Sequence, residues 1–273
     1  MSAINATATA SANVFGRFFR DTATLTGRTL THWRQRPVSI LLNCLFPVLM
    51  VLMFGYLFGG AMNLRDGDYM DYLIPGMLAM TMLFGLESLV VSVTNDTAKG
   101  VTERIRSMPI SPAPVIAGRS LADLLNAVVG LAVMVATGLL VGWTPNRGAA
   151  PTLAAIGLLL WLRFAFTWVG VYLGLLLKTP ESAVAVQVVV WPVGFLSSVF
   201  VSPDTMPGWL DAIATWNPLS ATATAVRELF GNPGWNSGDW AAQHSTILAL
   251  AWPAILTLVF LPLAVRQYQA LAK

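Results

Sequence analysis

Charged side chains are scarce in this sequence, and their scarcity excludes an ordinary soluble domain. Asp, Glu, Lys and Arg make up 11% of the 273 residues, whereas 56% of the residues are hydrophobic. A soluble domain usually carries roughly a quarter charged residues. So much apolar surface needs either hydrocarbon or a helix-lined interior. The composition therefore indicates an integral membrane protein with about five to seven helical spans of roughly 20 residues each.

Cysteine and histidine are also rare, which excludes several kinds of site. Cys44 is the single cysteine, so the chain cannot form an intramolecular disulfide or a zinc site with several thiolate ligands. His32 and His244 lie far apart in the sequence, which argues against a His-rich metal site. The sequence also lacks a P-loop, an HExxH motif and a serine nucleophile elbow. We therefore expect no enzyme activity, no metal and no cofactor bound by this chain.

Long hydrophobic runs are what the sequence has in abundance. We predict six transmembrane helices, over residues 38–61, 72–93, 115–141, 152–177, 183–201 and 247–265. Prolines inside these runs are compatible with spans, because neighbouring helices can satisfy the carbonyls that a proline frees. The prediction is an all-α membrane fold in which residues 37–273 form a single six-span domain.

Residues 1–36 precede these runs and fall into two parts. Residues 1–13 are mostly Ala, Thr, Ser and Asn, and they predict a disordered tail. Residues 14–36 predict an amphipathic helix, because aromatic residues such as Phe15 and Phe18 recur at helical spacing while arginines lie mostly elsewhere. Such a helix lies in the headgroup plane of the membrane. A helix packed on the cytosolic end of the bundle is a second interpretation, and the two are compatible.

The distribution of Lys and Arg predicts the orientation of the chain. If the N-terminus is cytosolic, three cationic residues, Arg65, Arg147 and Arg227, fall on outside segments, and Arg163 lies within a span. The other twelve of the sixteen fall on inside segments: Arg17, Arg20, Arg28, Arg34, Arg36, Lys99, Arg104, Arg106, Arg119, Lys178, Arg266 and Lys273. Because cytoplasmic loops carry the excess of Lys and Arg, we expect both termini in the cytosol of a bacterial inner membrane.

The segment 202–245 is too long for a simple turn and is rich in Trp and Pro. Its apolar residues suggest two short helices, broken by Asn217-Pro218. Tryptophans at 209, 216, 235 and 240 suit a membrane interface, so we predict that the two helices re-enter the outer leaflet. A folded external cap is the alternative.

Several short motifs follow this topology in a fixed order. They are Gly-Val-Thr-Glu-Arg-Ile-Arg-Ser-Met-Pro at 100–109, Gly-Arg-Ser-Leu-Ala-Asp at 118–123, Met-Pro-Gly-Trp-Leu at 206–210, Asn-Pro-Leu-Ser at 217–220 and Ala-Val-Arg-Glu-Leu at 225–229. Each motif alone is weak, but their order and placement are specific. The chain resembles the membrane subunit of ABC-2 type exporters, particularly the daunorubicin-resistance (DrrB-like) group, over essentially its whole length.

The resemblance implies a half-size permease that pairs with a second, identical or related membrane subunit. Two separate ATPase subunits, which carry ATP and Mg, would bind its cytosolic face. In this family the segment between the second and third spans is the coupling helix, which here is 96–112. The implied ATPase contacts are Glu103, Arg104 and Arg106, with Lys178 and Glu181 in a smaller cytosolic turn. From the residues alone, 96–112 is equally a solvated basic loop.

Charged and amide side chains inside the predicted spans are the candidate path residues. Glu87, Asp123 and Arg163 each cost roughly 3 kcal/mol in hydrocarbon, so they should pair or face a wet interior. Arg163 can pair with either carboxylate, or Asp123 can pair with Arg119 one helical turn away. These groups either line an export path or tie helices together. Further candidates are Asn126 and Gln187 as interhelical hydrogen-bonding groups, and Phe46, Met50, Met80, Met82 and Phe84 as pocket residues.

The predicted function is export of a hydrophobic or amphiphilic compound, such as a drug, an antibiotic or a lipid, by a permease driven by a partner ATPase. A related alternative changes the cargo to a lipid-linked polysaccharide or another glycolipid. A second alternative is a proton-coupled secondary transporter in which Glu87 and Asp123 carry protons. An intramembrane enzyme or scaffold is disfavoured because no catalytic constellation is found.

Overall fold

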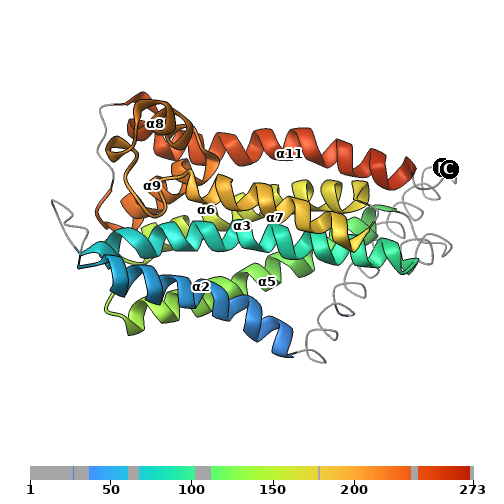
Figure 1. Cartoon of the computed structure of the whole chain (residues 1–273), viewed down its shortest axis with the longest axis horizontal. Helices are drawn as coiled ribbons and strands as arrows, with labels where there is room; N and C mark the ends of the chain where they lie inside the picture. The colour runs from blue at the N-terminus through green and yellow to red at the C-terminus, as the bar shows by residue number, and fades with distance from the viewer. Residues whose placement is uncertain are drawn as a thin grey trace, which may run out of the picture.

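The described part of the chain is entirely helical in its regular structure. The computed structural model describes residue 27 and residues 37–60, 68–101, 112–177, 179–234 and 239–270. Its helices are α2 (Pro37–Phe58), α3 (Tyr69–Ala98), α5 (Pro112–Leu140), α6 (Ala149–Leu176), α7 (Pro180–Phe195), η1 (Pro203–Thr205), α8 (Gly208–Thr215), α9 (Pro218–Phe230), α10 (Trp240–Gln243) and α11 (Ser245–Ala270). Figure 1 shows the long helices running side by side along the long axis, with α8 and α9 gathered at one end.

Four described helices are long and apolar enough to cross a membrane, namely Tyr69–Ala98, Ala117–Leu140, Ala149–Leu176 and Ser245–Ala270. Two shorter apolar helices, Cys44–Phe58 and Glu181–Phe195, overlap the first and fifth predicted spans. The all-α fold is therefore confirmed for the described residues, with four candidate spans, while the count of six spans stays a prediction. The predicted tail and amphipathic helix, 1–36, lie outside the described residues apart from Gly27.

Helix α3 lies at the centre of the bundle. It packs against α2, α5, α6, α7 and α9, as its middle position in Figure 1 indicates. Asp68 begins the helix, since its carboxylate accepts a hydrogen bond from the Met70 N–H at 3.2 Å. Residues on all sides of α3 are buried, which explains why its sequence has little amphipathic character.

The fifth predicted span differs from the helix that forms there. The hydrophobic run extends to residue 201, but α7 ends at Phe195. Pro192 lies inside α7, the Leu196 N–H still donates to its carbonyl at 2.7 Å, and the helix ends three residues after the proline. The carbonyl oxygens of Leu196, Ser198, Val199 and Phe200 accept hydrogen bonds from side chains elsewhere in the chain.

The two short helices predicted between the last spans are present as α8 and α9. Asn217 separates them as predicted, and its side-chain oxygen accepts from the Leu219 N–H at 2.9 Å, capping α9. Helix α9 is buried along most of its length against α3, α6 and α11. Trp209, Trp216 and Trp240 are more than half exposed. Re-entry of these helices into the outer leaflet stays a prediction.

Candidate functional site

An arginine deep in α6 holds three helices together. Arg163 is 1% exposed and forms an ion pair with Asp123 of α5. Its two terminal nitrogens also donate to the carbonyl oxygens of Met82 and Gly85 on α3, both at 2.9 Å. Thr167 donates to the second carboxylate oxygen of Asp123 at 2.7 Å. Both terminal nitrogens of Arg163 and both carboxylate oxygens of Asp123 therefore have partners, as a buried ion pair requires, whereas Arg163 Nε has none among the described residues.

The predicted pairing of Arg163 with an intramembrane carboxylate is thus confirmed, with Asp123 as the partner. The alternative pairing of Asp123 with Arg119 is wrong. Arg119 instead donates to Asp96 of α3 at 2.7 Å and to Ser92 at 3.1 Å. One helical turn separates Arg119 from Asp123 on α5, so the two side chains reach different neighbouring helices from the same region of α5.

Gly85 makes room for the arginine against α3. A Cβ atom at this position would overlap Arg163 Nη1. Only a residue without a side chain lets the guanidinium approach the α3 backbone so closely. The glycine therefore belongs to the same structural unit as the Arg163–Asp123 pair.

Beside this pair lies a cavity of about 500 Å³, which we call the polar cavity. Four of the five predicted intramembrane polar residues line it: Glu87, Asn126, Arg163 and Gln187. The fifth, Asp123, reaches it through its bond to Arg163. The remaining lining residues are Cys44, Phe46, Pro47, Thr81, Met82, Phe84, Gly85, Ser88, Val91, Ala127, Gly130 and Trp191. The candidates that are scattered in sequence therefore share one space between α2, α3, α5, α6 and α7.

Glu87 is a carboxylate that lines the polar cavity. Its Oε1 atom is buried and has no hydrogen-bond partner among the described residues. A buried carboxylate oxygen without a partner is costly, so the group is available to bind something that enters the cavity. The described residues contain no cluster of three His, Cys, Asp or Glu side chains that could hold a metal.

An aromatic wall forms one side of the polar cavity. The ring centroids of Phe46, Phe84 and Trp191 lie 5.3 to 5.5 Å from one another. Among the predicted pocket residues, Phe46, Met82 and Phe84 line the cavity, whereas Met50 and Met80 do not. Sequence reasoning missed Trp191, because its run reads as uniformly apolar and only the packing of α7 on α3 brings this side chain to Phe84.

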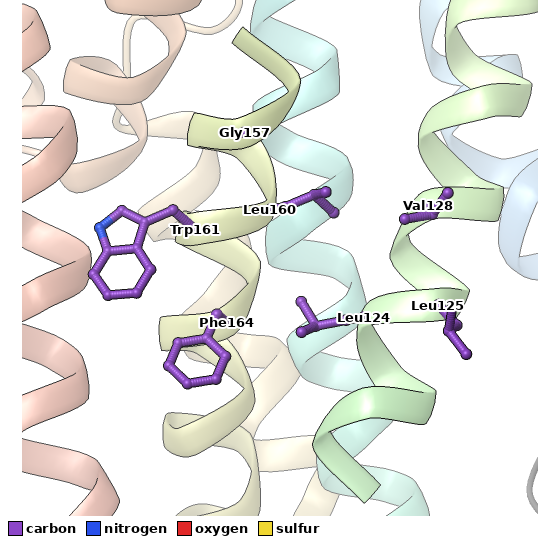
Figure 2. Close-up of a pocket in the computed structure, with 7 residues that line it drawn as sticks. All are labelled: Leu124, Leu125, Val128, Gly157, Leu160, Trp161 and Phe164. Atoms are coloured by element: carbon purple, nitrogen blue, oxygen red, sulfur yellow. The ribbon is translucent and has the colours of Figure 1, made fainter. Parts of the chain in front are cut away.

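A second hollow lies between α5 and α6, with a volume of about 380 Å³. Figure 2 shows Leu124 of α5 and Leu160 of α6 reaching into the space between the two helices. The other lining residues are Leu125, Val128, Gly157, Trp161 and Phe164. Its lining is apolar throughout, so this groove suits a hydrocarbon chain and offers nothing for polar recognition.

Arg227 of α9 forms a second buried cation site that sequence reasoning assigned to an outside loop. It is fully buried, donates to the carbonyl oxygens of Tyr72 and Ser198 at 2.9 Å, and lies 3.7 Å above the Tyr72 ring. It also donates to the Val199 carbonyl at 3.2 Å. In the sequence, Arg227 belongs to the motif at 225–229. The predicted topology gave no reason to expect that this motif is buried.

The predicted ATPase contacts are mostly beyond what the structure describes. Glu103, Arg104, Arg106 and Lys178 lie outside the described residues. Glu181 is exposed in the first turn of α7, beside the capping residue Thr179. Its position leaves the carboxylate accessible to a partner, and the contact itself stays a prediction.

Comparison with known proteins gives consistent results over nearly the whole chain. The family model of the ABC-2 type transporter matches residues 20–230. The "Daunorubicin resistance ABC transporter permease protein DrrB1" of Streptomyces coeruleorubidus is 36% identical over 255 residues, which cover 90% of this chain and 88% of the relative. The "Probable doxorubicin resistance ABC transporter permease protein DrrC" of Mycobacterium tuberculosis is 22% identical over 218 residues, which cover 80% and 79%.

Proposed function

The chain belongs to the ABC-2 type transporter family, and from this premise we propose that it is the membrane subunit of an ATP-driven exporter. The cargo we propose is a hydrophobic or amphiphilic compound, such as a drug, an antibiotic or a lipid. The names of two relatives refer to resistance against daunorubicin and doxorubicin, which agrees with this class.

The polar cavity is the observation that carries the proposal. It has about 500 Å³ of space and combines an aromatic wall with several polar side chains, which suits an amphiphilic small molecule. Glu87, Asn126 and Gln187 supply polar contacts without turning the space into a hydrophilic channel. Arg163 is engaged by Asp123 and by two backbone carbonyls, so its role is to fix the wall of the cavity.

Energy for transport comes, in this proposal, from partner subunits. Two ATP-binding subunits with ATP and Mg dock on the cytosolic face at 96–112, through Glu103, Arg104 and Arg106, with Lys178 and Glu181 as a smaller contact. A second permease subunit, identical or related, completes the transporter. Closure of the ATPase pair then tilts the helices that flank the docking segment as rigid bodies.

The test begins with purification of the chain from its native host in mild detergent, followed by mass spectrometry of the proteins that accompany it. We expect an ATP-binding subunit that is lost when Glu103 and Arg104 are changed to Arg and Glu. If the variant retains the subunit, the protein is still an ABC exporter subunit, but the ATPase binds at other residues. Its complete absence with a folded chain would favour the proton-coupled transporter instead.

The cargo is tested by reconstituting the purified complex in proteoliposomes with doxorubicin as the probe. ATP-dependent transport of doxorubicin that Glu87→Gln weakens supports the polar cavity as its path. The matched control is Asp71→Asn, an acid-to-amide change on the same helix outside the cavity lining. Equal transport by the Glu87→Gln variant and wild type would exclude Glu87 from the path, and transport of a glycolipid alone would favour the polysaccharide alternative.

A further inference from the structure

The ion pair between Arg119 and Asp96 has no part in the polar cavity, yet it occupies a defined position. Asp96 lies in the last turn of α3, and Arg119 lies two turns into α5. Ser92 precedes Asp96 by four residues and accepts a hydrogen bond from the same guanidinium nitrogen, at 3.1 Å. The three side chains therefore join α3 to α5 beside the point where each helix meets the proposed docking segment.

Helix α5 has a second connection to its neighbours one turn farther along, at Asp123. Asp123 of α5 is paired with Arg163, which in turn is bonded to the α3 carbonyls at Met82 and Gly85. Helix α5 is thus joined to its neighbours at two successive turns, once by a partly exposed pair and once by a buried pair. Farther along, many α5 side chains are exposed, including Val128, Val129, Leu139 and Leu140.

We propose that Arg119 and Asp96 are positioning residues, whose pair makes the ends of α3 and α5 move as one unit when the docking segment is displaced. This inference rests on the proposed function, because that segment receives the motion of the ATPase. Helix α3 contributes Thr81, Phe84 and Glu87 to the polar cavity, and α5 contributes Asn126 and Gly130. If both helices are displaced together, the two walls of the polar cavity that they form move together as well.

The Arg119–Asp96 pair contributes too little free energy to decide folding, so a positioning role suits it better. Its side chains are 28% and 39% exposed, and solvent-exposed pairs contribute little to global stability. Removing it should leave the chain folded, because the buried Arg163–Asp123 pair remains. The change is local: the two helix ends are no longer attached to each other, which can be measured as faster hydrogen exchange at those ends.

The first test measures hydrogen exchange of the full chain in lipid nanodiscs and needs no ATPase. The variants are Arg119→Asp, Asp96→Arg and the double swap, with Arg266→Asp as the control at an exposed cation of α11. We expect both single variants to exchange roughly tenfold faster in the last turn of α3 and the first two turns of α5. The double swap restores protection, and the control leaves it unchanged.

The second test measures doxorubicin transported per ATP hydrolysed by the same variants in the reconstituted complex. We expect this ratio to fall roughly fivefold in the single variants, with the ATP-binding subunit still bound, and to recover within about twofold in the swap. A structural role alone would not separate transport from hydrolysis in this way.

The outcomes separate the inference from the proposed function. Unchanged exchange in the single variants, or no recovery in a folded double swap, overturns the pair as a connection between the helix ends. Faster exchange with an unchanged transport ratio overturns its part in coupling. Restored exchange in the swap supports the connection even if the wild-type complex shows no ATP-driven transport, and that failure would count against the proposed function.

Discussion

At the scale of single residues, the Arg163–Asp123 pair should decide whether the bundle folds. Changing Arg163 to Ala leaves the Asp123 carboxylate buried without its counter-charge, which typically costs about 3–5 kcal/mol. We expect a large loss of folded yield in detergent, measured by size-exclusion chromatography, and a lower thermal unfolding temperature. The paired replacement Arg163→Met with Asp123→Leu should recover much of the loss, because no charge then remains unpaired. Wild-type yield and stability in the single variant would contradict this account.

Gly85 gives a second residue-scale prediction about the same pair. A methyl group there would collide with the Arg163 guanidinium, so Gly85→Ala should displace the arginine and lower stability by roughly 1–3 kcal/mol. Gly157→Ala on α6 is the matched control, since a Cβ atom at that position meets nothing within 4 Å. Thermal unfolding of both variants in the same detergent makes the comparison. Equal behaviour of the two would mean that the guanidinium does not need the close approach.

At the scale of elements, Arg227 anchors the segment that follows α7. Without the guanidinium, the Val199 carbonyl loses its side-chain donor, whereas the Ser198 carbonyl keeps the Tyr72 hydroxyl; an unsatisfied buried group costs about 1–3 kcal/mol. We expect Arg227→Met to increase hydrogen exchange and proteolysis in residues 196–201 while α6 and α11 keep their protection. Arg147→Met, at an exposed cation, is the control. Unchanged exchange in 196–201 would show that the tyrosine and asparagine contacts suffice.

The same segment shows where reasoning from the sequence succeeds and where it stops. Apolar runs predict helices because each span must satisfy its own backbone, so α3, α5, α6 and α11 are found where expected. The end of α7 at Phe195 was not predictable, since it depends on Tyr72, Arg227 and Asn217 donating to carbonyls from distant positions. The hydropathy of the local sequence does not predict those contacts.

The sequence predicts which polar residues line the polar cavity, but it does not predict that they share one space. Burial cost identifies Glu87, Asp123 and Arg163 one by one, because each charge is expensive in hydrocarbon. Their assembly into one space depends on which face each helix turns toward α3, and weak amphipathic character leaves that face undetermined. For the same reason, pairing of Asp123 with Arg119 or with Arg163 could not be settled before the interhelical contacts were known.

At the scale of the whole molecule, orientation follows from where the cations fall, and it can be measured directly. Arg147 lies between α5 and α6, whereas Arg266 lies near the end of α11, and both are exposed. With Cys44 replaced by Ser, we expect an impermeant maleimide to label Arg147→Cys in intact cells and to label Arg266→Cys only after permeabilisation. This pattern follows from the excess of Lys and Arg that cytoplasmic segments retain. Labelling of Arg266→Cys in intact cells would invert the topology, and the docking segment 96–112 could then not meet a cytosolic ATPase.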